Sequence, residues 1–93
     1  MADPITRFAN ISMRAFADMA AAAKPSSPFA QARETLGDRF FDVAVEGLRA
    51  GLKALLTDAS VIDDLNAAGE WAARERLLGV AQAGISAVIE AGS

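Results

Sequence analysis

The oxygen-bearing side chains best placed to bind a metal ion lie close together in the sequence: Asp58, Ser60, Asp63 and Asp64. A calcium loop of the EF-hand type needs a regular series of oxygen ligands and a glycine at its sixth position. Counted from Asp58, that position holds Asp63. Acidic residues at the start of a helix are also favoured by the helix dipole. We therefore expect Ser60, followed by Asp63, to cap a helix, and we predict no metal site.

Catalytic side chains are few, because the chain contains no histidine and no cysteine. This composition excludes thiolate nucleophiles, disulfides and metal sites with His or Cys ligands. A serine nucleophile would need Lys24, Lys53 or a carboxylate as its base. Asp38 and Asp42 have the spacing of one solvated helix face, and no glycine leads into a phosphate-binding GK[ST] motif. We predict no catalytic residue and no cofactor, with an accessory subunit of an enzyme as an alternative.

The charge of the chain bears on its partners. Nine basic and twelve acidic side chains give a net charge of −3, without a basic stripe. Nucleic-acid binding needs such a stripe to neutralise phosphates, so we expect a protein partner and no nucleic acid. The longest uncharged stretch, 77–89, is too short to span a bilayer, and no secretory signal opens the sequence. We expect a cytoplasmic protein without a transmembrane segment.

Helical periodicity runs through almost the whole sequence, and no stretch alternates as a strand would. The Pro-Ser cluster at 24–28 predicts a break within a single helical domain, 1–93. The first helix is expected over 4–23, with Asp3 as its cap and Pro4 at its first position. Its apolar stripe includes one polar residue and comprises Ile5, Phe8, Ser12, Phe16 and Met19.

The remaining helices follow from caps and glycines. Ser27 and Pro28 begin a helical pattern that reaches about Leu56, and Gly37 is the natural break within it. We expect helices over 28–36, 38–57, 61–68 and 70–90, with a possible kink at Gly69 before the last of these and Gly92 at its C-terminus. The predicted fold is an all-α bundle of four to five helices.

The segment 38–57 is expected to be the central helix. Its apolar residues cover about 240° of the circumference, whereas one core-facing stripe needs little more than ~100°. Phe40, Val43 and Leu48 are expected mainly in the core. The other apolar side is a candidate interface and carries Phe41, Val45, Leu48, Leu52 and Leu55.

Two further patterns concern helix packing. Gly47 with Gly51, and Gly79 with Ala83, are small-residue pairs one turn apart. They predict seams where helix backbones approach closely, with a gap for a ligand as the alternative.

In the last helix, Glu70 and Arg74 have the spacing of an i,i+4 ion pair beside Trp71. These three residues are either structural or the rim of an interface, in which Trp and Arg are enriched.

Together these patterns predict a non-enzymatic, acidic interaction module such as an adaptor, inhibitor or assembly factor. Its first partner is expected to be a second copy in a homodimer, because small domains often depend on oligomerisation. The alternative is a protein that binds an apolar ligand, or coats a lipid or granule surface, through helices rich in Ala and Gly.

Overall fold

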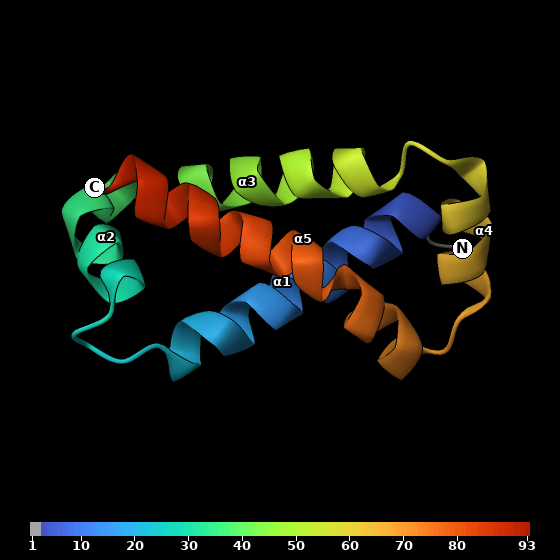
Figure 1. Ribbon diagram of the computed structural model, residues 1–93, viewed down its shortest axis with the longest axis horizontal. Helices are drawn as coiled ribbons and strands as arrows, with labels where there is room; N and C mark the ends of the chain where they lie inside the picture. The colour runs from blue at the N-terminus through green and yellow to red at the C-terminus, as the bar shows by residue number, and fades with distance from the viewer. Residues whose placement is uncertain (1–2) are drawn as a thin grey trace.

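Five α-helices and one short 3-10 helix make up the computed structural model, which describes residues 3–93. They are α1 (Pro4–Ala22), α2 (Pro28–Leu36), η1 (Gly37–Arg39), α3 (Phe40–Leu55), α4 (Ala59–Ala67) and α5 (Glu70–Ala91). The bundle measures 39 × 21 × 21 Å. Figure 1 shows α3 and α5 running along it, α1 crossing α5, and α2 and α4 closing opposite ends. The described residues contain no strand, so the predicted all-α bundle is confirmed.

Local capping explains where the middle helices begin and end. Ser27 accepts a hydrogen bond at its Oγ from the Ala30 N–H (3.1 Å), and Pro28 occupies the first turn of α2. Gly37 ends α2 with a φ of 54°, a conformation that side-chain-bearing residues rarely adopt. The cap expected at Ser60 is wrong. The carboxylate of Asp58 accepts a hydrogen bond from the Ser60 N–H (2.9 Å), so α4 begins two residues earlier.

The central helix is α5, and not the segment 38–57 as expected. α5 packs against α1, α2, α3 and α4, whereas α3 makes most of its contacts with α5 alone. The reason is the small size of many α5 side chains, including Ala73, Ala81 and Gly84, which are all buried. Small residues let neighbouring helices approach α5 closely from several directions, whereas large apolar residues would hold them apart.

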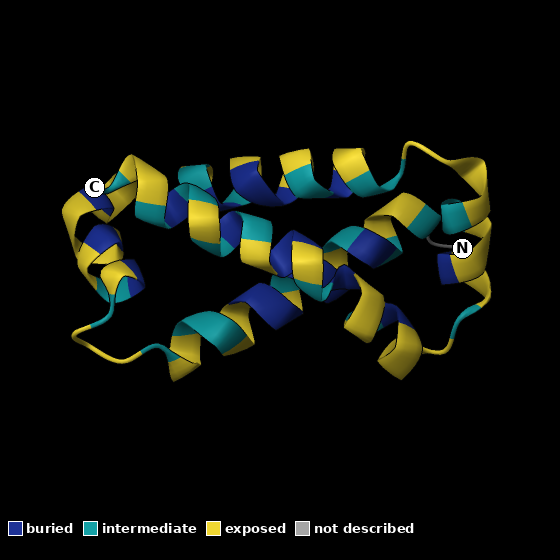
Figure 2. Cartoon of the chain, in the orientation of Figure 1, coloured by how far each residue is buried: buried dark blue, intermediate teal, exposed yellow. Residues whose placement is uncertain are grey.

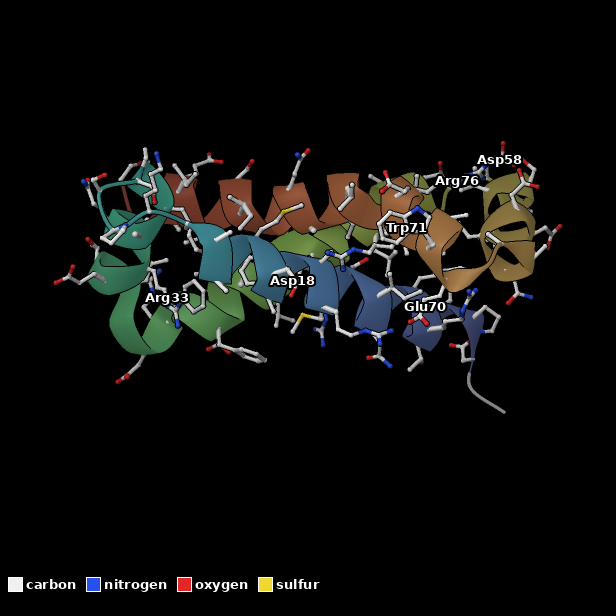
Figure 3. All side chains as sticks on the ribbon, turned by 90° about the horizontal axis from the view of Figure 1, so that it is seen from below. Asp18, Arg33, Asp58, Glu70, Trp71 and Arg76 are labelled. Atoms are coloured by element: carbon white, nitrogen blue, oxygen red, sulfur yellow. The ribbon has the colours of Figure 1, made fainter. Side chains whose placement is uncertain are left out.

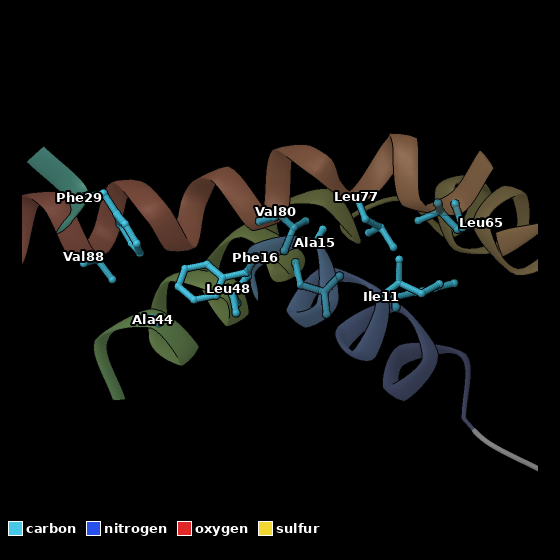
Figure 4. Close-up of a cluster of buried hydrophobic side chains, with 14 of the residues drawn as sticks. Ile11, Ala15, Phe16, Phe29, Ala44, Leu48, Leu65, Leu77, Val80 and Val88 are labelled. Atoms are coloured by element: carbon cyan, nitrogen blue, oxygen red, sulfur yellow. The ribbon is translucent and has the colours of Figure 1, made fainter. Parts of the chain in front are cut away.

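A continuous core joins all five α-helices (Figures 2 and 4). Its side chains are apolar apart from Ser12 of α1, and the large members include Phe8, Ile11, Phe16, Phe29, Leu36, Leu48, Leu52, Leu65, Leu77, Val80 and Val88. Phe40 and Val43 are half-buried against it. Ile5, expected on a buried stripe, is instead exposed, and Trp71 is exposed as well.

Three phenylalanines fix the end of the bundle at which α2 lies. The rings of Phe16, Phe29 and Phe40 come from α1, α2 and α3, and their centroids are 5.9–6.1 Å apart. The Arg33 guanidinium lies 4.8 Å from the centre of the Phe40 ring. Edge-to-face aromatic contacts and a cation over a ring each add to the stabilisation from burial alone. This cluster ties α2 to the longer helices.

Gly47 and Gly51 lie where α3 meets α5 most closely. A Cβ added at Gly47 would lie 2.6 Å from the Ala87 Cβ and 3.0 Å from the Ala83 carbonyl oxygen. At Gly51, it would lie 2.9 Å from the Ala83 Cβ. The close-packed seam predicted from these two glycines is therefore present. The role expected for Gly79 is wrong, because it faces open space.

Arg7 fixes the opposite end of the bundle. Its guanidinium donates hydrogen bonds to the carbonyl oxygens of Leu65 (3.0 Å) and Ala68 (2.9 Å), where α4 ends. Carbonyl groups at a helix C-terminus lack partners within the helix and carry the negative end of its dipole. Together with the fully buried Leu65, this contact holds α4 against α1.

Candidate interaction surface

The five α3 residues predicted to form an interface are divided between the core and the surface. Leu48 and Leu52 are buried within this chain, so they are not available to a partner. Val45 and Leu55 are half-buried, and Phe41 is 62% exposed. The apolar surface of α3 is therefore narrower than the sequence indicated.

A groove of about 330 Å³ lies between α1 and α3. It forms because both helices pack chiefly on α5 and contact each other little. Its lining is apolar apart from Ser12 and Arg49, and consists of Ala9, Ser12, Met13, Phe41, Val45, Leu48, Arg49, Leu52 and Val80. We call it the α1–α3 groove. The side chains of Leu48, Leu52 and Val80 are buried, so they form its floor.

Ser12 is the buried polar residue of this groove. It is 1% exposed, and its Oγ has no hydrogen-bond partner within the protein. A buried hydroxyl without a partner costs roughly 1–3 kcal/mol, and most buried polar groups in proteins are paired. The sequence contains the signal for this position, because Ser12 interrupts an otherwise apolar stripe. Periodicity alone does not show that the stripe borders a groove.

One edge of the groove is a strip on the outer surface of α3, formed by Phe41, Val45 and Arg49, which we call the α3 ridge. Its residues are spaced four apart and therefore share one helix face. Charges flank the ridge in a polarised order. Asp42 and Glu46 lie toward the N-terminus of α3, and Lys53 lies with Arg49 toward its C-terminus, all exposed.

The ion pair expected between Glu70 and Arg74 is wrong, because both side chains bind α1 instead. Arg14 donates to Glu70 (2.7 Å), and Arg74 donates to Asp18 (2.9 Å). Since α5 begins beside α1, the opposite charges on α1 lie within reach and compete with the partner on the same helix. These two cross-helix pairs fasten the first turns of α5 to α1.

Trp71 lies between these ion pairs and is 73% exposed. A hollow of about 480 Å³ beside it is lined by Ile11, Arg14, Ala17, Asp18, Glu70, Trp71 and Arg74. Figure 3 shows Asp18, Glu70 and Trp71 where α1 meets α5. The charges around this hollow balance, so it carries no electrostatic preference for a partner.

The acidic residues near α4 do not converge. Within residues 3–93, no group of three or more Asp or Glu side chains is arranged to hold a metal ion. Asp64 lies 4.0 Å from Arg76, and Asp58 caps α4. The hydrogen bond from the Ser60 backbone N–H, followed by that from the Ser60 side chain, lowers the pKa of Asp58 below its ordinary value. These carboxylates therefore have local structural partners.

Comparison with protein-family models, with curated proteins and with solved structures gave no match. In the part of the chain that the structure describes, no helix combines the length and apolar character that crossing a bilayer requires.

Proposed function

We propose that this protein is a non-enzymatic interaction module of the cytoplasm that pairs with a second copy of itself through the α3 ridge. The observation that carries the proposal is the exposure of Phe41 beside the half-buried Val45 and an apolar groove. Aromatic residues at the centre of an apolar patch are typical anchors of protein interfaces.

The order of charges along α3 supports an antiparallel pair. When two identical helices pack antiparallel, the N-terminal half of each lies against the C-terminal half of the other. In the register centred near Val45, Asp42 of one copy lies near Arg49 of the second copy. A parallel pair would bring like charges together. Complementary charges guide association and fix the register of the two helices.

The same two-fold arrangement brings the α3 ridges of the two copies into complementary contact. With the axis near Val45, the two Val45 side chains meet, and Phe41 of each copy faces Arg49 of the other. A guanidinium over an aromatic ring is attractive by about 0.5–2 kcal/mol. A standard interface buries roughly 800 Å² per partner. That is about one-seventh of the 5854 Å² surface of the chain, which one long side of the bundle can supply.

Sedimentation equilibrium at about 100 µM tests the proposal, since contacts of this kind give measurable dimer at micromolar to millimolar concentrations. We expect a dimer mass for the parent and a monomer mass for Phe41→Glu. The matched control is Ile5→Glu, which adds the same charge to an exposed apolar residue of α1 and should remain dimeric. Leu52→Glu is unsuitable, because Leu52 is buried and the variant would unfold.

Charge reversal tests the antiparallel arrangement. Asp42→Arg should weaken the dimer, and Arg49→Glu combined with Asp42→Arg should restore most of it. A monomeric parent at this concentration would overturn self-association. A dimer that both substitutions leave unchanged would place the interface elsewhere on the bundle.

A further inference from the structure

The α1–α3 groove combines apolar walls with one unused hydrogen-bonding group. The Ser12 hydroxyl is buried and has no partner, although it lies on a helix whose other core-facing side chains are apolar. Ligand sites in proteins have this composition, in which apolar walls surround a few polar groups that fix the orientation of the ligand.

We propose that this groove binds a small apolar molecule that carries one uncharged hydroxyl or amide group, which pairs with Ser12. The site goes beyond self-association, because Ser12 lies beneath the surface and outside the α3 ridge. Its occupant fills the space between Met13 of α1 and Val45 of α3.

The size and charge of the occupant follow from the groove. Its volume of about 330 Å³ lies near the lower end of the range for small-molecule sites, ~300–1,000 Å³. At about 30 Å³ per atom, as for liquid water, it holds on the order of ten non-hydrogen atoms. An ionised group beside Ser12 would lose its hydration among Leu48, Leu52 and Val80, so the polar end of the occupant is uncharged.

The experiment compares benzyl alcohol with ethylbenzene, which have the same number of non-hydrogen atoms and differ by a hydroxyl in place of a methyl. Binding is followed by the NMR shift of the Met13 methyl group. The Met19 methyl group lies outside the groove and serves as the control. We expect saturable shifts at Met13 with both probes, and weaker binding of benzoate than of benzyl alcohol.

Ser12→Ala isolates the hydrogen bond. We expect the affinity for benzyl alcohol to fall about 2- to 10-fold, as for the loss of one neutral hydrogen bond, while the affinity for ethylbenzene is kept. The variant should fold, since it removes a buried polar group without a partner, and its dimer mass should match that of the parent. Ala9→Leu, which fills the groove, should abolish the binding of both probes.

Three results would overturn the proposal. The first is an unchanged Met13 signal in folded protein up to the solubility of the probes. The second is a loss in Ser12→Ala that is equal for benzyl alcohol and ethylbenzene. The third is binding of benzoate as tight as that of benzyl alcohol. Failure of self-association alone would leave all three measurements interpretable, because each reports on the groove in whichever oligomeric state is present.

Discussion

The two long sides of α3 differ in how completely they are covered. Toward α5, Gly47 and Gly51 bring the helix backbones together, and the side chain of Leu48 fills the space that remains. Toward α1, the larger Phe41 and Val45 leave a groove between the helices. Small side chains close an interface between helices, whereas large ones that extend past the neighbouring helix leave apolar surface for another molecule.

The largest effect is expected where α3 is fully covered. Leu48→Ala should lower the free energy of unfolding by about 2–5 kcal/mol, because it opens a cavity in the core. Val45→Ala, three residues away on the open side, should cost less than about 1 kcal/mol. Urea unfolding in dilute solution measures both. Equal losses would show that the two sides are covered alike.

The glycine seam gives the next contrast. Gly47→Ala should destabilise the protein by about 1–3 kcal/mol, because the added methyl group meets Ala87 and the Ala83 backbone. Gly79→Ala is the control, since its methyl group would enter open space within a helix. That variant should gain about 0.5–1 kcal/mol from the better helix propensity of alanine. Thermal unfolding of the pair is sufficient, and a stabilising Gly47→Ala would contradict the close approach of α3 and α5.

A smaller effect on folding is expected at the exposed end of the ridge. Phe41→Ala should change the stability of the dilute monomer by no more than about 0.5 kcal/mol, because the ring is mostly in solvent. Its neighbour Phe40 packs against Phe16 and Phe29, so Phe40→Ala should cost more than about 1 kcal/mol. If chemical denaturation gave the reverse order, the orientation of α3 would be wrong.

The smallest effect is expected beyond the end of α3, at the cap of α4. The pKa of Asp58 is lowered in the folded protein, so its ionised carboxylate contributes stability above its unfolded pKa, about 3.9. That contribution is lost as the pH falls through the lower, folded pKa. The difference in melting temperature between the parent and Asp58→Ala should therefore be constant near neutral pH and shrink below about pH 4. Asp58→Asn, which keeps a capping oxygen but cannot ionise, should lose less than Asp58→Ala, and the difference between these two variants should not change with pH.

Much of the fold could be predicted because its determinants are local. Ser27, Pro28 and Gly37 act within a few residues of their own position, and they mark where α2 begins and ends. The glycine spacing of α3 likewise indicated a close neighbour. The cap of α4 was misplaced because Asp58 and Ser60 are both good capping residues, and the sequence alone does not decide between them.

The features that sequence reasoning missed depend on which helices are neighbours. Glu70 and Arg74 satisfy the rule for a pair on one helix, but Arg14 and Asp18 of α1 lie closer. Trp71 is exposed because the first turn of α5 extends past the core. The segment 38–57 was expected to be central because it carries many large apolar residues. The helix that is central, α5, owes its position to its small residues. In the candidate interface, the sequence pattern puts Phe41 and Leu48 on the same apolar side of α3. Only the tertiary structure shows that Phe41 is exposed and Leu48 is buried.

The position of α5 has a consequence for how the protein is made. This helix contacts the four other α-helices, and it follows them in the chain. While the ribosome is still synthesising residues 70–91, the emerged helices lack the surface on which they pack. Domains fold as units once their chain is available. The N-terminal segments are therefore expected to remain exposed, and accessible to chaperones, until translation has passed α5.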